Sequence, residues 1–111
     1  MKKIYVAGAY SSDNIIGVFD NIRRGIHTSY GLLNAGYAPF VPWFDWLFLL
    51  IGPVSLDKLR EYTLVWMRGC EAVYVIPEGL ENSKGTHHEI KVAESLGIPV
   101  YYDIEELFEN E

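Results

Sequence analysis

A carboxylate and a loop that contains serine and glycine occur together in the segment Ser83–Glu89. This segment follows the apolar run Ala72–Ile76 and leads into a helical pattern. A buried strand, a loop and a helix start in this order form small-molecule sites at the carboxyl ends of parallel strands. We expect Glu89 in the first turns of that helix, where the helix dipole and backbone N–H groups favour its charged form. The segment therefore predicts a carboxylate with a low pKa that faces a small ligand.

Two other interpretations of the same segment are open. Thr86 and Glu89 have the spacing of a capping box, in which two side chains satisfy each other's backbone N–H groups at a helix start. His87 and His88 could suggest a metal, but adjacent helical residues point about 100° apart and the chain has no H-E-x-x-H spacing. Glu89 is therefore either a catalytic carboxylate or part of a helix cap, and we expect neither a metal nor a cofactor.

Length and composition predict one domain over residues 1–111, since a single core accounts for roughly 100 to 150 residues. Half of the residues are hydrophobic, which is enough for a compact core. The net charge of -6 opposes binding to DNA or RNA, because neutralisation of phosphates supplies most of that affinity. The single cysteine, Cys70, excludes an intramolecular disulfide and fits a reducing compartment.

The longest apolar run, Trp43–Ile51, is interrupted by Asp45 and is far shorter than the roughly 20 residues of a membrane-spanning helix. We therefore expect no membrane partner. The apolar stretch after Met1 is too short for a secretory signal, so we expect a cytoplasmic protein. Exposure of the run Trp43–Ile51 would be costly on a monomer, so it predicts a homodimer or a higher homo-oligomer.

Strands and helices alternate along the predicted chain. Apolar runs predict strands over residues 3–7, 37–41, 72–76 and 100–102. Periodicity predicts helices over the stripe from Phe19 to Leu33, from the cap Ser55 to Trp66, over residues 86–96, and over a short last segment, 104–108. This order predicts an α/β fold, a small flavodoxin- or Rossmann-like parallel sheet of four to five strands in the order 2-1-3-4, with helices on both faces. The loops after strands 1 and 3 leave the sheet where the strand order reverses, and we place the site there.

Four segments in this order resemble the nucleoside 2-deoxyribosyltransferase-like family. They are Ile4–Gly8, Asn21–Arg24, Trp66, and the pattern Ser83-x-Gly85-x-x-x-Glu89. The family includes 2'-deoxynucleoside 5'-phosphate N-hydrolases, which cleave the glycosidic bond of deoxynucleotides. The resemblance implies that Glu89 is the nucleophile or a ribose-binding acid, that Tyr5 hydrogen-bonds it, and that Ser83 helps to bind the 5'-phosphate.

The residue types suit this chemistry. Breaking an N-glycosidic bond passes through an oxocarbenium-like state, which a carboxylate either stabilises or attacks. A hydrogen bond from Tyr5 would lower the pKa of Glu89 and fix its rotamer. Tyr5 could instead be a core aromatic residue, and Tyr10 is a second hydroxyl that could donate this hydrogen bond. Phosphate would bind N–H groups around Ser83 and Gly85. Arg23 or Arg24 would reach the phosphate from the first helix, unless both lie on a solvated face of that helix. Gly8, in the loop after strand 1, is a further candidate for binding the substrate.

The chain departs from the family where an aspartate usually stands on the second helix: this position is Thr63, which cannot protonate a leaving base. We expect Asp45 to take this catalytic role, with Asp57 and Glu61 as alternatives. Trp43 is a candidate for stacking on the base, although such aromatic residues more often pack in a core.

Two function classes follow. The first is an enzyme that cleaves the N-glycosidic bond of a nucleoside or its 5'-monophosphate, or that transfers the deoxyribosyl group. The second is a non-catalytic nucleotide-binding or signalling module on the same fold. Release of free base over time distinguishes them.

Overall fold

The central sheet of the computed structural model, which describes all residues 1–111, has four parallel strands in the order β2-β1-β3-β4. The strands are β1 (Lys3–Ala7), β2 (Ala38–Phe40), β3 (Ala72–Val75) and β4 (Val100–Tyr101). Within the sheet, Ile4 pairs with Ala72, and Ala7 pairs with Val75. The predicted strand order and parallel direction are confirmed.

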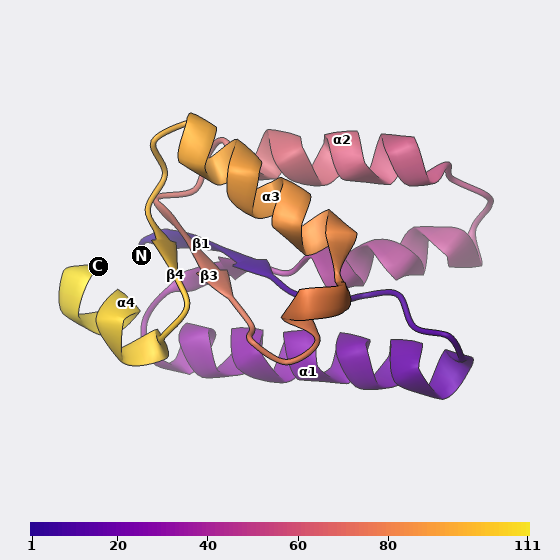
Figure 1. Cartoon of the computed structure of the whole chain (residues 1–111), viewed down its shortest axis with the longest axis horizontal. Coiled ribbons are helices and arrows are strands. Elements are labelled where there is room, and N and C mark those ends of the chain that lie inside the picture. Colours follow the sequence, from indigo (N-terminus) through magenta and orange to yellow (C-terminus); the bar gives the residue numbers. More distant parts are fainter.

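Helices cover both faces of this sheet, as predicted (Figure 1). The α-helices are α1 (Ile15–Asn34), α2 (Leu56–Met67), α3 (Lys84–Ser95) and α4 (Ile104–Asn110). One face lies against α1 and α4, and the opposite face lies against α2 and α3 (Figure 1). No helix of this structure combines the length and the apolar character that crossing a membrane requires.

Alternation along the buried strands divides the core between these faces. Ile4 and Val6 point into the cluster on the α1 side, whereas Tyr5 and Ala7 point into the cluster on the α2 and α3 side. All four are fully buried, as expected for a central parallel strand. The hydroxyl of Tyr5 is therefore placed below α2 and α3.

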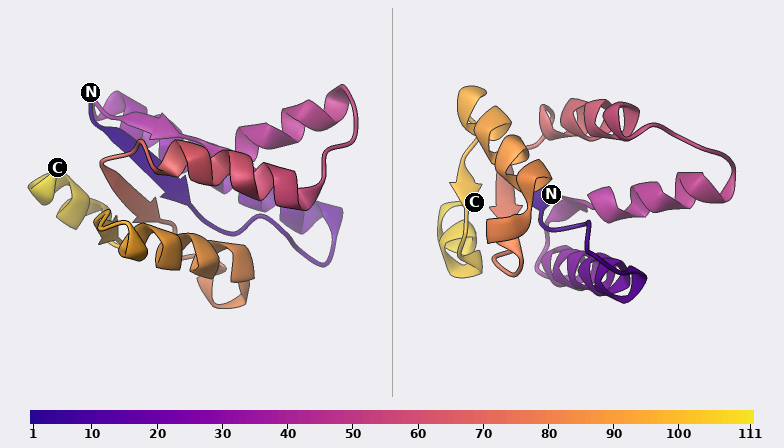
Figure 2. Two further views of the ribbon diagram at one scale, coloured as in Figure 1. Left: turned by 90° about the horizontal axis from the view of Figure 1, so that it is seen from above. Right: turned by 45° about the vertical axis from the view of Figure 1, so that its right-hand side comes forward.

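Two local features differ from the prediction. The apolar run after β2 forms a 3₁₀-helix, η1 (Pro42–Leu50), which begins with a proline. The connection from η1 to α2 extends beyond one end of the sheet (Figure 2). In addition, α3 begins at Lys84, two residues before the predicted start, because the side chain of Ser83 caps it. A second short 3₁₀-helix, η2 (Leu80–Asn82), precedes that cap.

Candidate functional site

The centre of the candidate site is a hydrogen bond from the Tyr5 hydroxyl to Oε2 of Glu89. Tyr5 is 0% exposed, and its ring stacks on Phe40 with 5.5 Å between the ring centroids. Glu89 reaches the hydroxyl from the second turn of α3. The predicted pairing of these two side chains is present in the structure.

The capping interpretation of Glu89 is wrong. The N-cap of α3 is Ser83, whose Oγ accepts a hydrogen bond from the backbone N–H of Thr86 at 3.4 Å. The two hydroxyl oxygens of Ser83 and Thr86 lie 2.5 Å apart. Glu89 therefore lies beyond the first turn and takes no part in the cap.

The predicted low pKa of Glu89 is also corrected. Burial raises the pKa of this carboxyl to about 7. The hydrogen bond from Tyr5 lowers the pKa, the charge of Asp45 raises it, and the charge of Arg60 lowers it. The loss of solvent raises the pKa of Glu89 more than the hydrogen bond and the charge of Arg60 lower it. Glu89 also lies beyond the first turn of α3, where the helix dipole acts.

Thr63 stands next to this pair. Its side chain is buried, and its Oγ1 donates a hydrogen bond to the backbone carbonyl of Arg60 at 3.0 Å. Burial raises the pKa of Tyr5 well above its ordinary value, as does the carboxylate of Glu89, while the Thr63 hydroxyl lowers it. The position where the resemblance calls for an acid therefore belongs to the site, but it holds a neutral hydroxyl.

A cavity of about 1210 Å³ opens beside Glu89. Its walls come from the loop after β1, the start of α1, η1, α2 and the start of α3. The predicted site residues that line it are Gly8, Tyr10, Arg24, Trp43, Asp45, Ser83, Gly85 and Glu89. This volume is ample for a small ligand with a phosphate group.

Asn21 fixes one wall of the cavity. Its Nδ2 donates to the backbone carbonyls of Tyr10 and Ser11, at 3.1 and 3.2 Å. Its Oδ1 accepts a hydrogen bond from Nη1 of Arg24 at 3.0 Å. One side chain thus holds both the loop after β1 and the guanidinium that borders the cavity.

Asp45 faces the same cavity from η1, and its Oδ1 is buried without a hydrogen-bond partner. Burial raises the pKa of Asp45, and the nearby hydroxyl of Tyr10 lowers it. Burial and the charge of Asp45 in turn raise the pKa of Tyr10. Asp45 and Glu89 are therefore the two carboxyl groups of the cavity lining that each stand beside a tyrosine.

Trp43 is 1% exposed and packs in the core cluster on the α1 side, the second of the two roles that the sequence left open, and it also lines the cavity. Its Nε1 donates to the backbone carbonyl of Ala9 at 3.0 Å. A Cβ on Gly25 would lie 2.2 Å from Cδ2 of Trp43, so α1 approaches the indole through a glycine. Trp43 supports the loop that borders the cavity.

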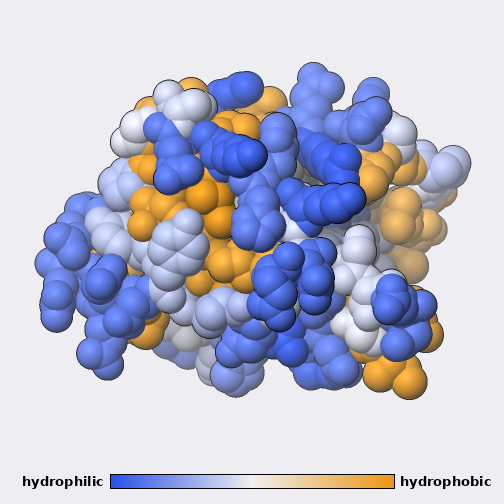
Figure 3. Space-filling model, in the orientation of Figure 1, coloured by the Kyte–Doolittle hydropathy of each residue, from blue (hydrophilic) through white to orange (hydrophobic).

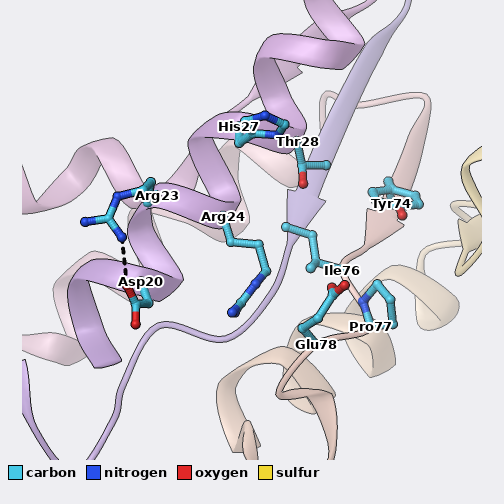
Figure 4. Close-up of a pocket in the computed structure, with 9 residues that line it drawn as sticks. All are labelled: Asp20, Arg23, Arg24, His27, Thr28, Tyr74, Ile76, Pro77 and Glu78. Atoms are coloured by element: carbon cyan, nitrogen blue, oxygen red, sulfur yellow. Dashed lines mark hydrogen bonds and ion pairs between the residues drawn. The ribbon is translucent and has the colours of Figure 1, made fainter. Parts of the chain in front are cut away.

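The two predicted arginines separate in the structure. Arg23 forms an ion pair with Asp20, with 2.7 Å between Nη1 and Oδ1, on the exposed side of α1. It borders a shallower groove of about 520 Å³ between α1 and the end of β3 (Figure 4). Arg24 borders both this groove and the larger cavity. Of these two arginines, only Arg24 is therefore placed to bind a ligand beside Glu89.

Sequence reasoning missed Arg60 as a site residue. It lines the cavity from α2, one turn before Thr63. Arg60 precedes Thr63 by three residues on the helix that Ser55 caps, so the two side chains share a helix face, and this spacing could have placed Arg60 at the site.

The family described as "Domain of unknown function (DUF4406)" matches residues 2–102, a range that includes every residue of the cavity. None of the curated proteins matches the chain.

Proposed function

The chain belongs to the DUF4406 family, and we propose that it cleaves the N-glycosidic bond of a nucleoside or its 5'-monophosphate, or transfers the deoxyribosyl group. The observation that carries this proposal is the Tyr5–Glu89 pair beside a cavity of nucleotide size. The resemblance to nucleoside 2-deoxyribosyltransferases and 2'-deoxynucleoside 5'-phosphate N-hydrolases supports it, and we propose kinship with that family.

In the proposed reaction, Glu89 faces C1' of the sugar. Its ionised carboxylate stabilises the positive charge that develops there, or attacks C1' to form a glycosyl ester that water or a second base then opens. The hydrogen bond from Tyr5 orients the carboxylate. A pKa of about 7 keeps a substantial ionised fraction of Glu89 at neutral pH.

The 5'-phosphate would lie at the start of α3. The backbone N–H groups of Lys84 and Gly85 form no hydrogen bond within the chain, and such groups at a helix start attract anions. Arg24, held by Asn21, supplies the charge. The base would extend toward η1, where Asp45 has a raised pKa and can carry a proton for the leaving group.

The alternative is a non-catalytic nucleotide-binding module, and Thr63 is the observation that favours it. Without an acid at this position on α2, the site binds a nucleotide through the same contacts and leaves the glycosidic bond intact.

We also propose a homodimer. The segment from Phe44 to Ile51 presents large apolar side chains to solvent; Ile51 is 92% exposed and Leu50 is 70% exposed. On α2, Val65 and Trp66 are exposed as well. Figure 3 shows apolar surface at the end of the molecule where η1 leads into α2.

The test is incubation with a panel of nucleosides and nucleoside 5'-monophosphates, followed by chromatography for free base. We expect Glu89→Gln to lower the rate by about 10² to 10³, the scale of losing one preorganised charge. Glu94→Gln, on the exposed side of the same helix, is the matched control and should leave the rate unchanged. Full activity in Glu89→Gln would remove the catalytic assignment, and a parent protein inactive on the whole panel would favour the binding module.

A further inference from the structure

The polar and the apolar side chains of the cavity come largely from different elements, which we call its polar end and its apolar end. Its polar lining comes from the loop after β1, the start of α1 and the start of α3, and includes Ser12, Asn21 and Ser83. Its apolar lining comes from η1, α2 and their connection: Leu49, Val54, Leu56 and Leu59. Leucine and valine side chains suit the flat face of a base, whereas the polar end suits a phosphate.

Arg60 is the one basic residue that η1 and α2 contribute to this cavity. Arg60 is exposed, and its guanidinium forms no ion pair and no hydrogen bond within the chain; the Thr63 hydroxyl bonds the backbone carbonyl of Arg60, not its side chain. The charge of Arg60 lowers the pKa of Glu89, so the guanidinium lies within electrostatic reach of the carboxylate. A free cation thus stands beside apolar side chains at the proposed base end.

We propose that Arg60 is the specificity-determining residue for the base, and that it binds a carbonyl oxygen of a departing pyrimidine such as uracil. This inference rests on the proposed function. A guanidinium donates hydrogen bonds in a planar fork but does not release a proton in proteins. Arg60 therefore acts by stabilising negative charge on the leaving base, in place of the acid that Thr63 replaces.

The bond between C1' and N1 of the pyrimidine breaks, and its electron pair stays on the base, where it is shared with the carbonyl oxygens. An oxygen of Glu89 forms a bond to C1'. Water then attacks C1', gives its hydroxyl to the sugar and frees Glu89, and the proton that water loses reaches the base through Asp45, the proton carrier of the proposed function. Charge-assisted hydrogen bonds from Arg60 to the carbonyl oxygen strengthen as the negative charge develops.

The experiment compares three substrates: 2'-deoxyuridine 5'-monophosphate, its 5-fluoro derivative and 2'-deoxyadenosine 5'-monophosphate. The variants are Arg60→Gln, Arg60→Lys and the control Lys58→Gln, which lies on the same helix outside the cavity. We expect Arg60→Gln to lower kcat/KM for the uracil nucleotide by about 10- to 100-fold, since a hydrogen bond to a charged group is lost.

The loss should be several-fold smaller for the 5-fluoro substrate, because fluorine already stabilises the departing anion. The adenine nucleotide, whose base has no carbonyl oxygen, should be unaffected by the substitution. Arg60→Lys should be intermediate, because it keeps the charge but loses the fork. Thermal melts check folding, and Arg60→Lys carries the comparison if Arg60→Gln does not fold.

Equal losses on all three substrates, or none, would overturn the role of Arg60 and leave the proposed function standing. A parent protein that releases adenine but no uracil would do the same. A parent protein that releases no base from any of the three would overturn the proposed function and this inference with it.

Discussion

Tyr5 and Glu89 are 84 positions apart in the sequence, yet the hydroxyl of the first donates a hydrogen bond to the carboxylate of the second. The contact exists because β1 is central in the sheet and points Tyr5 toward the face that α3 covers. Burial raises the pKa of Glu89 to about 7, and Tyr5 limits that rise. Glu89 therefore gains or loses its proton near neutral pH.

Activity should increase with pH through a value of about 7, because the proposed reaction needs ionised Glu89. Tyr5→Phe removes the hydrogen bond that lowers the pKa, so the rise should move to higher pH. Rates of base release between about pH 5 and about pH 9 measure both effects. A rate that instead falls above neutral pH would make Glu89 the proton donor.

The stability of the fold should respond to the same proton. The folded-state pKa of Glu89 is about 7, above its ordinary value of 4.5, so the neutral carboxyl is favoured by folding. The neutral carboxyl therefore stabilises the folded state fully below about pH 4.5, and this stabilisation is lost as the pH rises through about 7. Glu89→Gln cannot ionise, and it should gain on the order of 2 kcal/mol relative to the parent between about pH 5 and about pH 8.

Urea unfolding of both proteins at the two pH values gives this difference directly. Parallel pH dependence in the parent and in Glu89→Gln would show that folding does not raise the pKa of Glu89.

Gly25→Ala should destabilise the fold by about 2 kcal/mol or more, because the new methyl group would overlap the buried indole of Trp43. Gly31→Ala is the matched control on the same helix: its Cβ would meet nothing within 4 Å. That change should stabilise α1 by up to about 1 kcal/mol. Thermal or urea unfolding measures both, and equal effects would mean that the packing of Trp43 does not constrain α1.

The sequence is sufficient for the sheet and for part of the site. Hydrophobic periodicity predicts the four strands, and the cap Ser55 predicts the start of α2, since both depend on local patterns. The strand order follows from the helices that connect successive strands. The pKa of Glu89 could not be predicted, because it depends on which groups surround the carboxyl after folding. The same holds for Arg60 and for Trp43, whose roles follow from how η1 and α2 lie against the rest of the chain.

The apolar segment of η1 bears on assembly, and two equally exposed residues test it. Leu50 in this segment and Ile16 at the start of α1 are each 70% exposed. In a homodimer that buries the η1 surface, Leu50→Glu places a charge in the interface and should produce monomers, whereas Ile16→Glu should leave the dimer intact. Sedimentation velocity at micromolar concentration separates the two species. A parent protein that sediments as a monomer, or the same response from both variants, would rule out a dimer through this surface.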